Sequence, residues 1–223
     1  YYRILGRLRG NGRLLEGCTA ALVVTGQGEL YTKSIARTLA LSANMAGCAF
    51  IGRPLVEAAA SPQNFRTQAE LTGMDEAAAY AAALRELAQR LAGHTPLPPI
   101  RRLVALHASS RSTSNTLALW DLVRRNLDGV AIREFGLRNG TVMDCIGCSY
   151  SACLHYGERG GCFYGGVMTE EVFPAILDCD ALVMLCANYN DALSANLTAC
   201  VNRLTALYRR TRFYDKRLYG LVV

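Results

Sequence analysis

Two groups of residues in this chain have the types and the spacing to do chemistry. The first is a polar loop, residues 109–116, which is rich in Ser, Thr and Asn. It follows an apolar run and precedes apolar residues at helical spacing, Leu117, Trp120 and Val123. Hydroxyl and amide donors beside the unpaired backbone N–H groups of a helix start suit a phosphate. An ordinary capped turn between a strand and a helix has the same sequence features, so both interpretations stay open.

The second group is a set of four cysteines in one short segment, the cysteine loop (residues 144–164). Their spacing is C-x2-C-x4-C-x8-C: Cys145, Cys148, Cys153 and Cys162. Thiolates this close in sequence suit a metal ion or an iron–sulfur cluster. Three interpretations stay open: a [4Fe–4S] cluster, a zinc ion, and thiols without a metal. The other cysteines lie on predicted strands or helix faces and are expected to be small buried side chains: Cys18, Cys48, Cys179, Cys186 and Cys200.

Alternating strand and helix patterns must position both groups, and they predict an α/β fold with a parallel, doubly wound sheet. Apolar runs predict strands over 18–24, 48–51, 103–108, 130–135, 180–186 and 218–223. Helical spacing predicts helices over 34–46, 75–92 and 194–210, and helices that begin near 117 and at 169. Residues 54–73 are expected to form a loop or an irregular cover, and the prolines of 94–102 predict a linker. His107 and Trp120 are expected to be packed core side chains.

From Ala108 to Thr116 the chain resembles the family of NAD(P)H-dependent FMN reductases and iron–sulfur flavoproteins, whose first strand is followed by Gly-Ser-Pro-Arg-x-x-Gly-Asn-Thr. Ala108, Ser110 and Ser114 stand where that family often has Gly, Pro and Gly. The resemblance implies a flavodoxin-like sheet of order 2-1-3-4-5 with FMN at its carboxyl edge. It also implies that the polar loop binds the FMN phosphate through Ser109, Arg111, Ser114, Asn115 and Thr116.

Two further stretches resemble the flavin-binding loops of the same family. Residues 187–197, ANYNDALSANL, are similar to its Pro-x-Tyr-x-x-x-x-Ser-x-x-Leu stretch, with Ala187 in place of Pro. This implies contacts with the flavin ring from Asn188, Tyr189 and Asn190, because backbone amides and an aromatic side chain suit a flat ring that forms hydrogen bonds. Residues 25–28, TGQG, resemble the third flavin loop and imply contacts from Thr25 and Gly26.

The cysteine loop also has a counterpart in this family. Iron–sulfur flavoproteins carry a compact cysteine motif at the equivalent place, with tighter spacing, and bind a [4Fe–4S] cluster there. Other FMN reductases hold two or three cysteines without a cluster. The resemblance therefore leaves the choice among the three interpretations open.

The motifs occur in an unusual order. Residues 103–223 resemble the first part of an FMN reductase unit, whereas residues 1–93 resemble its last part. Leu221-Val222-Val223 also repeats Leu22-Val23-Val24. We therefore expect either a fragment of a tandem protein or a circularly permuted unit. Its domains would be a C-terminal half (1–93), a linker (94–102) and an N-terminal half (103–223), and the halves could complement each other in one sheet.

The resemblance implies an FMN-dependent oxidoreductase that takes hydride from NAD(P)H and passes electrons to a small molecule or a redox protein. No catalytic side chain is predicted, because the flavin supplies the chemistry. The alternatives are a flavodoxin-type electron carrier without enzymatic activity and a flavin-free interaction scaffold. Units of this family commonly dimerise, which implies a homodimer or an internal pair within a tandem protein.

Composition argues against several other classes of protein. With 51% hydrophobic and 19% charged residues, the chain is expected to be globular rather than disordered. No apolar run is long enough to span a bilayer and no signal-peptide pattern is seen, so no membrane segment is expected. The odd number of cysteines, nine, favours a reducing, cytoplasmic location. The net charge of +6 comes without a basic stripe interleaved with aromatic residues, so no nucleic-acid partner is expected.

Overall fold

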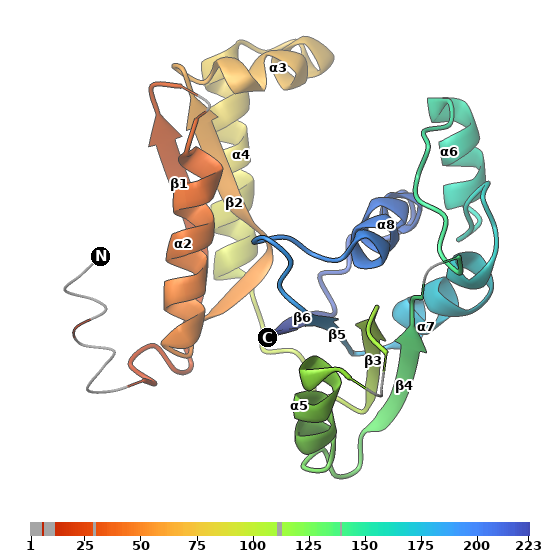
Figure 1. Ribbon diagram of the computed structural model, residues 1–223. Coiled ribbons are helices and arrows are strands. Elements are labelled where there is room, and N and C mark those ends of the chain that lie inside the picture. Colours follow the sequence, from red (N-terminus) through yellow and green to blue (C-terminus); the bar gives the residue numbers. More distant parts are fainter. Residues whose placement is uncertain (1–5, 7–11, 29, 111–112, 139) are drawn as a thin grey trace. The chain divides into compact units, whose positions relative to one another are not determined.

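The computed structural model describes residues 6, 12–28, 30–110, 113–138 and 140–223 of the chain (Figure 1). The chain divides into two compact units, Tyr1–Pro96 and Leu97–Val223. Each unit has parallel strands and helices in alternation, which confirms the predicted α/β class. No helix in the described parts is both long and apolar enough to cross a membrane.

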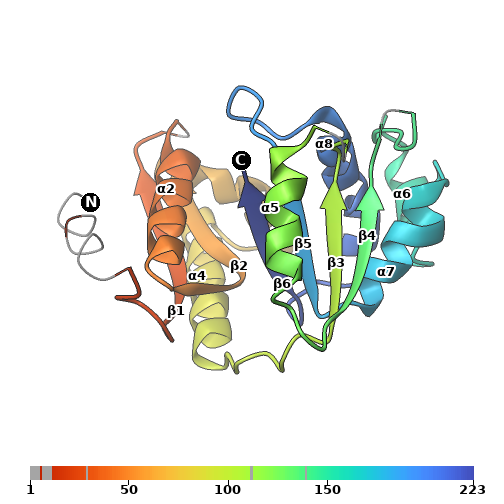
Figure 2. The same ribbon diagram turned by 60° about the horizontal axis from the view of Figure 1, so that its bottom comes forward.

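The C-terminal unit is built on a four-stranded sheet in the order β4-β3-β5-β6 (Figure 2). The strands are β3 (Arg102–His107), β4 (Ala131–Gly136), β5 (Ala181–Cys186) and β6 (Arg217–Val222), and all neighbours are parallel. Numbered within this unit, the order is 2-1-3-4. It matches the first four positions of the predicted flavodoxin-like sheet.

Helices cover both faces of this sheet, and its central strands accordingly carry apolar side chains on both faces, from Leu103 to Leu106 in β3 and throughout β5. On one face α5 (Asn115–Arg124) packs Leu117 and Trp120 against Leu103 and Ala105 of β3. On the other face Val104 and Leu106 contact a second core, because successive side chains of a strand point to opposite sides. That core is formed largely by η2 (Met168–Val172), α7 (Phe173–Asp178), α8 (Ala195–Arg203) and α9 (Thr205–Tyr208).

Two predicted helices of this unit differ in detail. The helix expected from Thr169 begins at Met168 as a π-helical turn and continues as α7. The helix expected over 194–210 is divided at Leu204, whose N–H is shared between the carbonyl groups of Cys200 and Val201. Apolar periodicity continues across such a local irregularity, so the sequence pattern could not reveal it.

The N-terminal unit has a two-stranded parallel sheet, β1 (Thr19–Gly26) and β2 (Ala49–Ala59), connected by α2 (Thr32–Met45). After β2 come η1 (Gln63–Phe65), α3 (Arg66–Thr72) and α4 (Glu76–Ala92). The N-cap of α4 is Asp75, whose carboxylate accepts the N–H of Ala78 at 2.7 Å. The buried core contains Ile51, Val56, Phe65, Ala69, Ala79 and Leu87.

The prediction of a loop over 54–73 is wrong. β2 continues through Pro54 to Ala59, and η1 and α3 follow. The register between β1 and β2 shifts after Ala20, which pairs with Phe50, so that Leu22 pairs with Leu55. Pro54 thus lies in a bulge, where its missing N–H costs no ladder hydrogen bond. Arg90 of α4 donates to the bulge carbonyl of Gly52 at 2.5 Å.

The two sheets are separate in the topology of the chain. β1 of the N-terminal unit pairs with β2, whereas β6, which carries the repeated Leu-Val-Val sequence, pairs with β5. The complementation of the two halves into one sheet, and the tandem or permuted origin of the chain, stay predictions.

Candidate functional site

Two loops of the predicted flavin site meet at one edge of the C-terminal sheet. β3 and β5 are adjacent and parallel, with His107 opposite Leu185 near their carboxyl ends. The polar loop follows β3, and residues 187–194, the Tyr189 loop, follow β5. The helices after these strands, α5 and α8, pack on opposite faces of the sheet (Figure 2). This edge is therefore the topological switch point, where open α/β sheets bind ligands.

The polar loop ends in a helix start with free donors. Ser114 is the N-cap of α5, and its hydroxyl accepts the N–H of Leu117 at 3.2 Å. The backbone N–H groups of Asn115 and Thr116 have no acceptor within the described part of the chain. These donors, together with the positive end of the helix dipole, fit the phosphate of FMN. Arg111, the other predicted phosphate contact, lies outside the described residues.

A buried polar network supports this loop from below. The N–H of Ser109 lies 3.3 Å from Nδ1 of His107, whose Nε2 is 3.4 Å from Oε1 of Glu134. Trp120 of α5 donates from its indole N–H to Oε2 of Glu134 at 3.1 Å. Nδ1 also lies 3.2 Å from the carbonyl oxygen of Ser109, so its role as donor or acceptor depends on the tautomer. A carboxylate beside Nε2 favours the proton on that nitrogen, and in this tautomer Nδ1 accepts the N–H of Ser109. The network therefore connects β3, β4, α5 and the start of the polar loop.

Sequence reasoning missed this network. It treated His107 and Trp120 as core residues, and both are indeed buried. The available signal was a charged residue at an inward position: Glu134 lies two residues after Ile132 and therefore on the same face of β4, the face that packs toward α5. Gly136 also has a structural role here, because a Cβ at this position would lie 3.2 Å from Cε1 of His107.

The Tyr189 loop presents an exposed aromatic ring. Tyr189 and Ala192 form an antiparallel bridge around Asn190 and Asp191, whose φ angles of 51° and 60° are typical of a type I′ turn. Asn188 stabilises the turn by accepting the N–H of Asp191 at 2.8 Å. Tyr189 is 58% exposed at the tip, so its ring is free to contact a flat ligand.

The structure gives residues in and just after the Tyr189 loop different local roles. Ser194 is the N-cap of α8 and accepts the N–H of Leu197, which is itself buried. Asn190 supplies the left-handed turn conformation that asparagine tolerates well. Ring contacts from Asn188, Tyr189 and Asn190 stay predictions.

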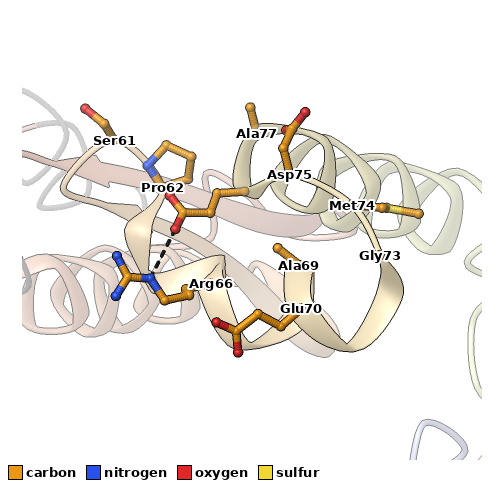
Figure 3. Close-up of a pocket in the computed structure, with 10 residues that line it drawn as sticks. Ser61, Pro62, Arg66, Ala69, Glu70, Gly73, Met74, Asp75 and Ala77 are labelled. Atoms are coloured by element: carbon orange, nitrogen blue, oxygen red, sulfur yellow. Dashed lines mark hydrogen bonds and ion pairs between the residues drawn. The ribbon is translucent and has the colours of Figure 1, made fainter.

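The third predicted loop belongs to the N-terminal unit. Thr25 and Gly26 end β1, and a Cβ on Gly26 would lie 2.7 Å from a methyl group of Thr32, so this close approach requires glycine. Their role toward FMN stays a prediction. A shallow pocket of the same unit lies between residues 61 and 77, where Arg66 pairs with Glu76 at 3.4 Å (Figure 3). It contains none of the predicted FMN residues.

The cysteine loop gives no support to the predicted [4Fe–4S] cluster or to zinc. Its residues are all described, and no group of three or more His, Cys, Asp or Glu side chains in the described chain is arranged to hold a metal ion. Cys145 is exposed, and Cys148, Cys153 and Cys162 are half-buried. Hydrogen bonds from α8 hold the first residue of the loop and the residue that follows the loop: Asn202 donates to Asp144 at 3.0 Å, and Arg203 donates to the carbonyl of Gly165 at 2.8 Å.

Four of the remaining cysteines are buried, as expected. Burial raises the pKa of Cys200 to about 12 and also raises the pKa values of Cys48, Cys179 and Cys186, so these thiols stay protonated. The expectation for Cys18 is wrong, because this residue is exposed. It precedes the first residue of β1 and therefore lies at the end of an edge strand.

Comparison with known proteins agrees with the geometry of this site. The family model for NADPH-dependent FMN reductases matches residues 101–223. No curated protein and no solved structure matches the chain. The matched region contains both loops at the carboxyl edge of the four-stranded sheet and covers more than half of the chain. The chain therefore belongs to the family of NADPH-dependent FMN reductases.

Proposed function

We propose that the C-terminal unit binds FMN at the carboxyl edge of its sheet and reduces it with NAD(P)H, passing the electrons on to a small molecule or a redox protein. Membership of the family indicates flavin reductase activity. The observation that carries the proposal is the switch point itself, where the polar loop and the Tyr189 loop follow adjacent parallel strands.

The polar loop would hold the phosphate of FMN. The N–H groups of Asn115 and Thr116 supply backbone donors, and the side chains of Ser109 and Asn115 add a hydroxyl and an amide. His107 acts indirectly, because it accepts the N–H of Ser109 and thereby fixes the first residue of the loop. Thr116 is buried beneath the loop and contributes to its packing.

The Tyr189 loop would orient the flavin ring. When bound, FMN supplies the hydride-accepting chemistry, and the protein has to bind the ring and exclude water from it. Tyr189 has an exposed aromatic ring and belongs to a turn that is closed by hydrogen bonds. We also propose that two such units pair, either as a homodimer or within a tandem protein. Analytical ultracentrifugation of the FMN-loaded chain tests for the homodimer.

The experiment for the proposed function is an anaerobic absorbance titration. The purified chain is loaded with FMN, freed of excess ligand and mixed with NADPH. We expect loss of the oxidised flavin band near ~450 nm. A chain that binds FMN but leaves this band unchanged would be an electron carrier, and a chain that does not take up FMN would be a flavin-free scaffold. Either result would contradict the proposal.

A further inference from the structure

Two cysteines lie on either side of the start of α6 (Tyr150–Gly157). Ser149 is the N-cap of this helix and accepts the N–H of Ala152 at 3.3 Å. Cys148 is the residue before the cap, and Cys153 is the fourth residue of the helix. Side chains at these two positions commonly pack against each other at helix starts. In this helix both positions are occupied by cysteines.

The surroundings of the two cysteines support a contact between their thiols. Burial raises the pKa of Cys148, and the neighbouring thiols of Cys153 and Cys145 raise it further. Tyr164 lies beside the same helix start, where its hydroxyl donates to the carbonyl of Gly147 at 3.4 Å. Cys148 and Cys153 are only half-buried, so both residues border solvent.

The arrangement suits a dithiol better than a metal centre. A [4Fe–4S] cluster and a structural zinc ion each take four protein ligands. Within the described residues, which include the whole cysteine loop, not even three such ligands converge. A disulfide needs only two sulfur atoms on a backbone that can bring their Cβ atoms together.

Hydrogen bonds also attach the segment that carries the pair to α8. Asp144, just before the loop's first cysteine, accepts the side-chain amide of Asn202 at 3.0 Å and the N–H of Cys145 at 2.7 Å. Arg203, which is buried, donates to Gly165 after the last cysteine. Both anchoring residues belong to α8, so one helix holds the first residue of the cysteine loop and the residue that follows the loop.

We propose that Cys148 and Cys153 form a redox-active dithiol whose substrates are small organic disulfides. The thiolate of one cysteine attacks a sulfur of the substrate, which forms a mixed disulfide and releases one substrate thiol. The second cysteine then attacks the protein sulfur of the mixed disulfide, which forms the Cys148–Cys153 bond and releases the other substrate thiol. The two protons of the cysteines go to the two released thiolates, and the two electrons go to the substrate.

The chemistry of the attacking thiolate gives this exchange a pH dependence. The attacking species is a thiolate, so exchange becomes faster as the pH rises.

Oxidised glutathione is the probe for the experiment. The fully reduced chain is mixed with it anaerobically, free thiols are alkylated, and the protein is cut with chymotrypsin. Cleavage after Tyr150 separates Cys148 from Cys153. Mass spectrometry is expected to find the two resulting peptides joined by a disulfide, with both glutathione molecules released as thiols.

Single serine variants divide the two chemical steps. In Cys148→Ser and Cys153→Ser we expect the first glutathione to be released and the second to stay as a mixed disulfide, with its release slowed about tenfold or more. Cys145→Ser and Cys162→Ser are the matched controls and should keep the linked peptides. Far-UV circular dichroism of each variant verifies that it is folded.

Three results would overturn the proposal: independent alkylation of Cys148 and Cys153 after oxidation, a disulfide that joins either of them to Cys145 or Cys162, or iron or zinc that copurifies with the chain and is lost in the serine variants. None of these measurements involves FMN. They therefore test the dithiol separately from the proposed reductase activity.

Discussion

The two units of this chain share the alternation of strand and helix but bury their large apolar side chains to different degrees. The largest fully buried side chains among the described residues all belong to the C-terminal unit, including Trp120, Phe173 and Leu106. In the N-terminal unit, large apolar residues of α2 and β1 stay exposed, such as Ile35 at 52% and Val23 at 53%. A sheet covered by helices on both faces can bury its strands completely, whereas a two-stranded sheet cannot. We therefore expect the C-terminal unit to have the higher unfolding free energy and to carry the candidate flavin site.

The first prediction tests this difference with the same substitution in each core. Phe173→Ala should lower the unfolding free energy of the C-terminal unit by about 3–5 kcal/mol, because Phe173 is fully buried. Trp120 is the single tryptophan and lies in this unit, so urea unfolding followed by its fluorescence measures this unit alone.

Phe65→Ala in the N-terminal unit is the matched control. Phe65 packs against Tyr80 with ring centroids 5.4 Å apart, so the substitution should shift the urea transition seen by far-UV circular dichroism. It should leave the Trp120 fluorescence transition in place. An equal shift of both transitions by Phe65→Ala would mean that the two units unfold together, and the comparison would fail.

The second prediction concerns the buried network under the polar loop. His107→Ala removes the acceptor of the Ser109 N–H and should weaken FMN binding about tenfold, which corresponds to the loss of one partly buried hydrogen bond. His107→Asn is the control, because its side-chain oxygen can accept the same N–H. Fluorescence titration of FMN measures both. Equal affinities for the alanine and asparagine variants would remove His107 from the site.

The third prediction compares two helix caps, one in each unit. Ser114→Ala and Asp75→Ala each remove a side-chain acceptor from the first turn of a helix, and each should cost about 1 kcal/mol of stability. Only Ser114→Ala should also weaken FMN binding, because α5 begins at the proposed phosphate site. Thermal unfolding and FMN titration of the two variants separate these effects. A loss of affinity in Asp75→Ala would contradict the assignment of the site to the C-terminal unit.

The smallest effect is expected from pH and concerns Asp180 at the start of the C-terminal sheet. The N–H groups of Arg101 and Arg102 donate to its carboxylate at 2.9 and 2.8 Å and hold its pKa below the ordinary value of 3.8. A lowered pKa in the folded state adds stability above the unfolded-state pKa, and this stability is lost as the pH falls through the folded-state pKa.

Melting temperatures of Asp180→Asn and the unchanged chain test this at two pH values. The variant should melt lower at pH ~7, and the difference should shrink when the pH falls to ~3. A difference that is the same at both pH values would show that the carboxylate charge of Asp180 does not contribute.

Sequence by itself determined most of the local elements and pointed to the place of the candidate site. The apolar runs of β3 and β5 and the helical spacing of α4 and α5 are properties of short segments, so their period predicts the element directly. The order of the elements then requires a parallel sheet, whose carboxyl edge collects the loops that follow β3 and β5. Asp75 and Ser114 could be recognised as helix starts for the same local reason.

Only the tertiary structure decided which distant residues meet. The hydrogen bond from Trp120 to Glu134, the burial of Arg203 against Gly165 and the passage of β2 through Pro54 all depend on neighbours from other elements. The spacing of the four cysteines allowed a cluster, but the helix start at Ser149 brings two of them to staple positions and leaves no three ligands together among the described residues. Periodicity is fixed by the nearest residues along the chain, whereas contacts across the fold are fixed by packing, and a local pattern does not record them.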